Sequence, residues 1–275
     1  MITLTGFSDE ISTDLNEQLT CLESESMRYL EFRGVWGKNV LKLNDAELAA
    51  VKEELQRREI GVSSIGSPIG KISIEDPFEP HLQDFERALH VAEYFNTRYI
   101  RVFSFFIPEN NDPSRYRDEV MERMNQLVKR AEKREIILLH ENEKDIFGDT
   151  SERCLDILQT VNSPSLRAAY DPANFVQCGV KPFKEAFPIL KPYIEYVHIK
   201  DAIHSDGHVT VAGKGDGQVK EALAALKQEG YNGFLSLEPH LQSAGTFKGF
   251  SGAQLFKEAT QACKVILDEL HWDWE

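Results

Sequence analysis

Short apolar, β-branched or aromatic runs alternate with longer amphipathic stretches along almost the whole chain. This alternation predicts a series of strands, each followed by a helix. The predicted strands span residues 2–7, 29–35, 62–67, 99–105, 136–142, 166–171, 193–201 and 233–239. The predicted helices span residues 14–26, 45–59, 80–95, 114–134, 151–161, 182–190, 218–229 and 252–270. Two helix starts carry capping residues, with Asn44 ahead of Glu47 and Thr150 ahead of Glu152.

Eight consecutive β–α repeats are typical of one α/β fold, the (β/α)8 TIM barrel. An open, doubly wound sheet also alternates strands and helices, but its dinucleotide-binding form has GxGxxG after the first strand. Here the first strand leads into GFSDE at residues 6–10, which lacks that motif. No Pro/Gly/Ser-rich linker or low-complexity tract divides the chain, so we predict a single barrel domain over residues 1–275.

The charge balance is strongly acidic: 45 Asp and Glu oppose 31 Lys and Arg, giving a formal net charge of −14 over 275 residues. Nucleic acid is not an expected partner, because a phosphate-binding face needs clustered Lys and Arg. No apolar run approaches the ~18–20 residues of a membrane span. The N-terminus lacks the basic and apolar regions of a signal peptide, and the four scattered cysteines form no CxxC pair. We expect a cytoplasmic protein with no membrane partner.

Ligand-type residues follow four consecutive predicted strands. The fifth strand ends in LLHENE, the sixth in AAYDPANF, the seventh in YVHIKD and the eighth in LSLEPH. The C-terminal strand ends of a barrel form its catalytic face, and these four strands are neighbours. Taken singly, each residue could cap a helix, form an ion pair or be a structural histidine, but their joint placement favours a metal site. The predicted ligands are Glu141, Asp171, His198 and Glu238.

Three carboxylates and one imidazole form an oxygen-rich donor set. Such a set suits one divalent metal ion, with Mn²⁺, Mg²⁺ or Co²⁺ favoured, and Zn²⁺ as an alternative because imidazole also suits zinc. Glu143 competes with Glu141 because it has the same strand parity. It lies further into the loop, however, where we expect a solvated or capping role.

These motifs resemble those of a known family. HENE, DPANF, VHIKD, the glycine-rich residues 213–217 and FLSLEPH are similar to the xylose isomerase-like TIM-barrel superfamily of sugar-phosphate isomerases and epimerases. GFSDEI and YLEFR extend the resemblance to nearly the whole chain. In that family a Glu, Asp, His and Glu from strands five to eight hold the metal, which implies the same four ligands here. One departure is Asn174, where several of the sugar epimerases have a histidine.

The predicted site suits enediolate chemistry. A divalent ion chelated by a ketose carbonyl and its neighbouring hydroxyl acidifies the carbon between them. Glu141 and Glu238 are the predicted catalytic bases, because they could flank a substrate from opposite sides. Residues at or beside the strand ends are the expected substrate contacts. They are Glu31, Arg101, Asn174, Lys200 and His240.

The sequence therefore predicts a metal-dependent isomerase or epimerase that acts on a small sugar, polyol or sugar acid. The alternative is a metal-dependent dehydratase of an inosose-like or dehydroshikimate-like ketone. A nuclease is third, since the acidic charge and the few strand-end histidines oppose it. A hydride shift would call for a second metal with extra carboxylates, which the strand ends do not offer. Residues 213–217 could bind a substrate phosphate or form a plain turn, and a homodimer is one option for the assembly.

Overall fold

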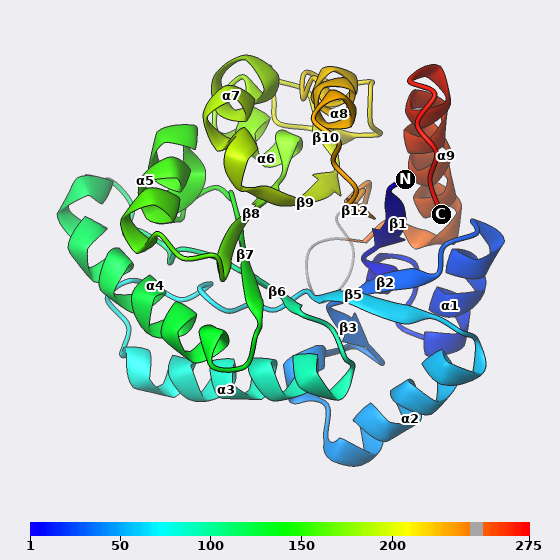
Figure 1. The fold of residues 1–275 in the computed structure, drawn as a ribbon, viewed down its shortest axis with the longest axis horizontal. Helices are drawn as coiled ribbons and strands as arrows, with labels where there is room; N and C mark the ends of the chain where they lie inside the picture. Colours follow the sequence, from blue (N-terminus) through cyan, green and yellow to red (C-terminus); the bar gives the residue numbers. More distant parts are fainter. Residues whose placement is uncertain (243–249) are drawn as a thin grey trace.

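Eight parallel strands form one sheet in the computed structural model, which describes residues 1–242 and 250–275 (Figure 1). In chain order they are β1 (Thr3–Gly6), β2 (Tyr29–Phe32), β5 (Gly61–Ile65), β6 (Tyr99–Val102), β7 (Ile137–Glu141), β8 (Leu166–Tyr170), β9 (Ile194–Ile199) and β12 (Phe234–Leu237). Their order around the sheet is β1-β12-β9-β8-β7-β6-β5-β2. A parallel bridge between Phe7 and Glu31 joins the two ends of the sheet. The sheet is thus a nearly closed barrel, and the predicted (β/α)8 fold is confirmed.

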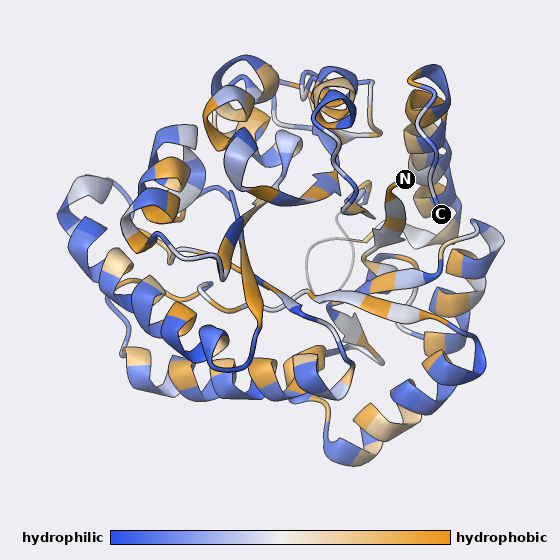
Figure 2. Ribbon diagram, in the orientation of Figure 1, coloured by the Kyte–Doolittle hydropathy of each residue, from blue (hydrophilic) through white to orange (hydrophobic). Residues whose placement is uncertain are grey.

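Helices surround the barrel and bury one face each (Figure 2). They are α1 (Leu15–Ser24), α2 (Asp45–Arg57), α3 (Phe78–Tyr94), α4 (Arg117–Glu132), α5 (Ser151–Val161), α6 (Pro172–Gln177), α7 (Phe187–Leu190), α8 (Val219–Gln228) and α9 (Gly252–Glu269). In α4 the buried Val120, Met124, Leu127 and Ala131 recur at helical spacing, which explains why this charged segment folds as a helix against the sheet. The predicted capping box at Asn44 is present at the start of α2.

Some predicted boundaries were wrong. The third helix begins at Phe78, since Pro80 falls in its first turn, where a missing N–H removes no helical hydrogen bond. The predicted helix 182–190 is a π-helical turn, Pro182–Ala186, followed by α7. The sequence analysis also missed α6, although Asp171 as N-cap and Pro172 at the first helical position are the usual start signals.

Two predicted strands are interrupted at a basic residue. The run 29–35 ends as β2 at Phe32 and resumes after Arg33 as β3 (Gly34–Val35), which forms a hairpin with β4 (Lys38–Asn39). The run 193–201 breaks at Lys200, and β10 (Asp201–Ala202) then pairs with β11 (Val209–Thr210). Both breaks occur at the C-terminal end of a barrel strand. The basic residue at each break, Arg33 or Lys200, contacts Glu238 at the barrel mouth.

The core has two parts. The larger cluster packs the helices against the outside of the sheet. A smaller cluster inside the barrel contains Leu139, Ala169 and Tyr196. Because side chains alternate between the two faces of a strand, the residues two positions further along these strands also face inward. Packing inside the barrel therefore fixes which strand-end residues meet at its mouth.

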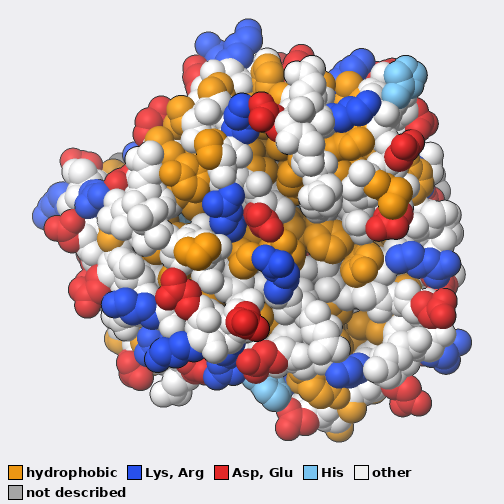
Figure 3. Space-filling view, in the orientation of Figure 1, with side chains coloured by type: hydrophobic (Ala, Val, Ile, Leu, Met, Phe, Trp, Pro, Cys, Tyr) orange, Lys and Arg blue, Asp and Glu red, His pale blue; other side chains and the backbone are white. Residues whose placement is uncertain are grey.

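No described helix is both long and apolar enough to cross a membrane. On the face shown in Figure 3, acidic and basic side chains are interspersed. The compartment, the assembly and the expected lack of a nucleic-acid partner stay predictions.

Candidate metal centre

Four ligand-type side chains from neighbouring strands meet at the mouth of the barrel. They are Glu141, Asp171, His198 and Glu238, here called the quartet, and they offer ligand atoms that all lie within 4.8 Å of one another. The Nδ1 atom of His198 lies 3.0 Å from Glu141 Oε1, 3.9 Å from Asp171 Oδ2 and 3.6 Å from Glu238 Oε2. All four residues are at most 2% exposed. The structure thus brings together the residues predicted as ligands.

Glu31 lies deeper in the barrel than the quartet, where it contacts His198. Its Oε2 atom is 3.3 Å from His198 Nε2 and accepts a hydrogen bond from Ser236 Oγ at 2.7 Å. The residue is fully buried. A carboxylate on the far nitrogen of a histidine fixes the orientation of the ring and raises its basicity as a ligand. The placement of Glu31 favours this positioning role over the substrate contact predicted from the sequence.

Two asparagines hold the β7 and β8 ends together. Asn142 donates to the Asp171 carbonyl at 2.9 Å and accepts from the Asp171 N–H at 3.0 Å. Asn174 donates from Nδ2 to Glu141 Oε1 at 3.2 Å, while its own N–H is capped by Asp171 Oδ1. Asp171 therefore caps α6 with one oxygen and turns the other toward the quartet. The capping role considered for a strand-end aspartate is therefore present, and the metal-ligand role stays a prediction.

Lys200 and Arg101 each contact two carboxylates of the quartet. Lys200 Nζ lies 2.8 Å from Asp171 Oδ2 and 3.0 Å from Glu238 Oε2. Arg101 Nη1 lies 3.2 Å from Glu141 Oε2 and 3.5 Å from Glu238 Oε1. Both side chains are nearly fully buried, so their charges act in a medium that screens them weakly.

Burial and charge act in opposite directions on the quartet. Burial alone would raise the pKa of Glu141, but His198 and Arg101 lower it to about 2. Burial also works against ionisation of Glu238, yet Lys200 and His240 hold the pKa of this carboxyl well below its usual range. For Asp171 burial prevails and raises the pKa to about 7, with Lys200 opposing. The two glutamates are thus ionised, as both a metal ligand and a base must be.

The quartet fits a divalent cation. Glu141 Oε2 and Asp171 Oδ2 are buried and are met by ion pairs, from Arg101 at 3.2 Å and from Lys200 at 2.8 Å, without a hydrogen bond from any described residue. Anionic oxygens in such a place can also coordinate a metal ion. Glu31 and the three quartet carboxylates place four acidic groups around His198, and the Lys and Arg side chains among the described residues that lie within 4 Å of them are Lys200, Arg101 and Arg33. Three carboxylates and one imidazole whose ligand atoms lie within 4.8 Å of one another form a donor set that suits a divalent ion.

A small cavity of about 130 Å³ opens beside the quartet. Its wall includes Arg101, Glu238 and His240, so two of the predicted substrate contacts lie on it. Glu143 also lies on this wall, where it pairs with Lys71 at 3.1 Å and takes no part in the quartet. Lys200 and Asn174 contact quartet oxygens but do not line this cavity. The cavity suits a small molecule with several polar groups.

Arg33, Asp9 and Glu10 belong to the same region, and the sequence analysis assigned them no role. Arg33 donates from Nε to Asp9 Oδ2 at 2.8 Å, and its Nη1 lies 3.4 Å from Glu238 Oε1. Burial raises the pKa of Glu10 to about 8, although Arg33 opposes the shift. Their positions in the sequence could have indicated a place at the site. Asp9 and Glu10 lie in the short turn after β1, and Arg33 directly follows β2 at the same end of the barrel.

The structure also contains a second group of ligand-type side chains, which corrects the expectation that the strand ends offer none. Glu10, Glu238 and His240 place one ligand atom each within 4.8 Å of one another. The sequence analysis missed this group because Glu10 comes from the short turn after β1, far from the other two in the chain.

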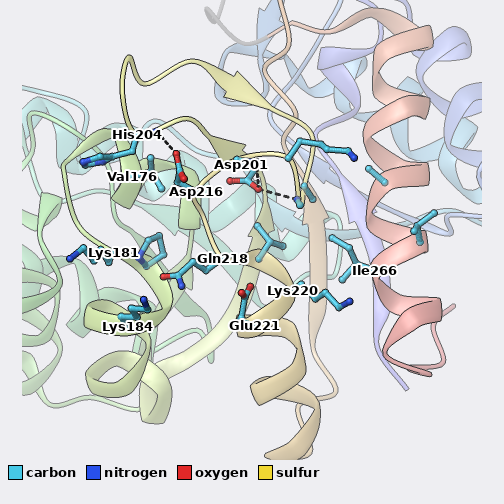
Figure 4. A pocket seen from close by; sticks show the side chains of 18 of the residues that line it. Val176, Lys181, Lys184, Asp201, His204, Asp216, Gln218, Lys220, Glu221 and Ile266 are labelled. Atoms are coloured by element: carbon cyan, nitrogen blue, oxygen red, sulfur yellow. Dashed lines mark hydrogen bonds between the residues drawn. The ribbon is translucent and has the colours of Figure 1, made fainter.

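The glycine-rich loop binds a carboxylate of its own chain. Asp201, directly after β9, accepts backbone N–H bonds from Gly213 at 2.9 Å, Gly215 at 3.0 Å and Gly217 at 2.7 Å. Asp201 is labelled in Figure 4 among the residues that line a larger cavity. This cavity has a volume of about 810 Å³, and no member of the quartet lines it. A Cβ on Gly215 would lie 2.4 Å from Asp201 Oδ1, which explains the glycine. These three amides therefore hold the loop in place, and the plain-turn interpretation is favoured over phosphate binding.

Comparison with known proteins identifies the family. Residues 24–264 match the family described as Xylose isomerase-like TIM barrel. The chain belongs to this family. No curated protein matches it.

Xylose isomerase-like barrels of known structure share the fold at low sequence identity. A D-tagatose 3-epimerase-like protein superposes with a TM-score of 0.80 at 18% identity, with 98% of each chain covered. The probable 3-DHS dehydratase AsbF from Bacillus anthracis gives 0.77 at 18% identity over 96% of this chain and 99% of its own. A xylose isomerase-like protein from Mycobacterium smegmatis, solved in complex with magnesium, gives 0.68 at 18% identity over 97% of each chain. At such identity the likeness shows the fold alone.

Proposed function

We propose that this protein is a divalent-metal-dependent isomerase or epimerase of a small sugar, polyol or sugar acid, acting through an enediolate. Glu141, Asp171, His198 and Glu238 would hold one ion, with Mn²⁺, Mg²⁺ or Co²⁺ favoured over Zn²⁺ by the three carboxylate oxygens. When bound, such an ion polarises a substrate carbonyl as a Lewis acid. Family membership and the buried quartet support this proposal.

The observation that carries the proposal is a pair of buried, ionised glutamates held by one guanidinium. Arg101 Nη1 lies 3.2 Å from Glu141 and 3.5 Å from Glu238, so one cation on the wall of the small cavity holds both carboxylates, and Glu238 itself lines that cavity. One glutamate would remove the proton from the carbon next to the carbonyl. If the other returns a proton to the opposite face, the product is an epimer, and if a proton returns to the adjacent carbon, the product is an aldose–ketose isomer.

The remaining predicted contacts receive distinct roles. Lys200, beside Glu238 and Asp171, would offset the negative charge that develops on the substrate oxygens. Asn174 orients Glu141 through its amide, and His240 would contact the substrate from the cavity wall. Glu31 would hold the His198 ring in place from below.

Lys200 also supports a second candidate, a dehydratase of a cyclic hydroxy ketone. In that reaction the enediolate expels hydroxide from the neighbouring carbon, and the charge on the departing oxygen needs a nearby cation. The buried ammonium of Lys200, 3.0 Å from the proposed base Glu238, supplies one. The two candidates share the proton removal and differ in whether water leaves.

Solvent deuterium tests the proposal. Metal-loaded protein would be incubated in D₂O with a panel of ketoses, inososes and sugar acids, and the products followed by ¹H and ²H NMR. An isomerase or epimerase should place deuterium on the carbon next to the carbonyl, and the labelled carbon separates the two. A dehydratase should yield an unsaturated product instead. Conversion of a sugar with its own hydrogen fully retained, under conditions in which product is released and rebound, would contradict the enediolate route.

A further inference from the structure

The second group of ligand-type side chains lies directly beside the quartet. Glu10, Glu238 and His240 form it, and Glu238 belongs to both groups. Glu10 is fully buried, and its Oε1 atom receives no hydrogen bond from any described residue. Its other oxygen accepts from the His240 N–H at 2.8 Å and from Ser251 Oγ at 2.9 Å, so the carboxylate cannot turn away. The Oε1 atom lies 3.1 Å from His240 Nε2, and a buried carboxyl group in such a place is stabilised in its ionised form by a nearby cation.

Arg33 provides the cation at that position. Its Nη1 atom lies 3.4 Å from Glu238 Oε1 and 3.4 Å from His240 Nε2, and its Nη2 atom lies 3.8 Å from Glu10 Oε1. The guanidinium therefore reaches all three members of the group. It is held there by the 2.8 Å bond to Asp9 and by the Phe7 ring, whose centre is 4.7 Å from the guanidinium carbon.

A guanidinium and a divalent ion could not share this space. Arginine stays charged throughout the physiological pH range, and two cations a few ångströms apart repel each other strongly where burial limits screening. Glu238 would then bind one metal ion on its quartet side and Arg33 on the other. The side chain of Arg33 also lies on the wall of the small cavity.

We propose that Arg33 is a built-in second cation of this site: its guanidinium holds the place beside Glu238 that a second divalent ion would otherwise take, and its removal turns a one-metal site into a two-metal site. The role of Arg33 in turnover rests on the proposed function. The number of metal ions bound does not.

The test counts Mn²⁺ per chain in wild type and in Arg33→Ala, after equilibration with excess Mn²⁺ and gel filtration. Wild type should hold one ion with an uncoupled EPR spectrum. Arg33→Ala should hold two, with the exchange-coupled spectrum of ions that share the Glu238 carboxylate. Arg33→Lys, which keeps a cation, should hold one. Arg33→Ala combined with Glu10→Gln should return to one, because the second ion loses a ligand.

Circular dichroism and thermal melting establish that each variant is folded. If Arg33→Ala does not fold, Arg33→Ala with Asp9→Asn removes the buried anion that Arg33 pairs with and leaves Glu10, Glu238 and His240 intact. One Mn²⁺ in a folded variant of either kind, or two coupled ions in wild type, overturns the inference. A wild type that binds one Mn²⁺ but converts no sugar would refute the proposed function and leave the metal count, and hence this inference, standing.

Discussion

Two sets of buried carboxylates lie at the C-terminal end of this barrel, and they are satisfied in opposite ways. Asp201 accepts four backbone N–H bonds, from Ala202, Gly213, Gly215 and Gly217, all between 2.7 and 3.0 Å. The quartet carboxylates are equally buried, but most of the groups that meet their oxygens are side chains, among them Arg101, Lys200, Arg33 and His198.

The difference separates a structural carboxylate from a ligand. Backbone amides donate to both oxygens of Asp201, so neither oxygen of this carboxylate is left without a hydrogen-bond donor. The quartet instead groups four ligand-type side chains around one point, which is the arrangement that a divalent ion requires. Burial alone, which both share, therefore does not identify a functional carboxylate. The identity of its partners does.

The largest effect should follow from removing a base. Glu238→Gln should lower kcat by about 10²–10⁴-fold, since an amide cannot accept the proton but keeps an oxygen for coordination. Steady-state kinetics on an active substrate, with Mn²⁺ affinity measured in parallel, would check this. Asp201→Asn is the matched control, because it neutralises a buried carboxylate at the same barrel end without touching the quartet. A parallel loss of metal and activity in Glu238→Gln would reduce this residue to a ligand.

A smaller effect, on metal affinity, is expected at Glu31, which contacts the quartet residue His198. Glu31→Gln should weaken Mn²⁺ binding by ~10–100-fold, because the His198 ring loses the carboxylate that orients it. Isothermal titration with Mn²⁺ gives the affinity directly. Ser236→Ala, which removes the 2.7 Å bond to Glu31 but keeps the Glu31 carboxylate, should weaken binding less. An unchanged Mn²⁺ affinity in Glu31→Gln would return this residue to the list of substrate contacts.

Asp201 should behave as a purely structural residue. Asp201→Asn should lower the free energy of unfolding by about 1–3 kcal/mol, because buried backbone N–H groups lose their acceptor. Urea denaturation would measure this, with Mn²⁺ affinity expected to stay at the wild-type value. Asp206→Asn, on the exposed turn of the same hairpin, should change the stability by no more than about 0.5 kcal/mol. Loss of Mn²⁺ binding in Asp201→Asn would break the contrast between the two regions.

The smallest effect is expected at Asn174. Its amide makes one 3.2 Å bond to Glu141, and a single buried hydrogen bond contributes roughly 0.5–1.5 kcal/mol. Asn174→Ala should therefore reduce kcat about two- to tenfold without abolishing Mn²⁺ binding. A loss as large as that of Glu238→Gln would show that Asn174 takes part in proton transfer.

The sequence was sufficient to predict the features that follow from the order of the strands and the alternation of their side chains. Strand ends and their parity predict the convergence of the quartet, because neighbouring parallel strands present equivalent positions at one barrel end. The contacts of Arg33 with Asp9 and Glu10 were beyond this reasoning. They depend on how β1 and β2 approach where the barrel closes, and pattern alone does not give that distance.

Other features were missed because two roles compete for the same residue type. Glu31 follows the same inward parity as a substrate contact, and only its depth below His198 distinguishes the two roles. Asp201 stands beside a glycine-rich loop that is equally consistent with phosphate binding. The direction of the loop amides toward a carboxylate of the chain itself is a tertiary property, invisible in the order of the residues.

Anomalous diffraction from crystals grown with Mn²⁺ tests the central claim most directly. We predict a single strong Mn²⁺ peak within about 2–2.3 Å of one donor atom from each member of the quartet. Asp201 should keep its four amide bonds and show no peak. No peak at the quartet under Mn²⁺-saturating conditions, or a peak elsewhere with the four side chains turned apart, would contradict the account.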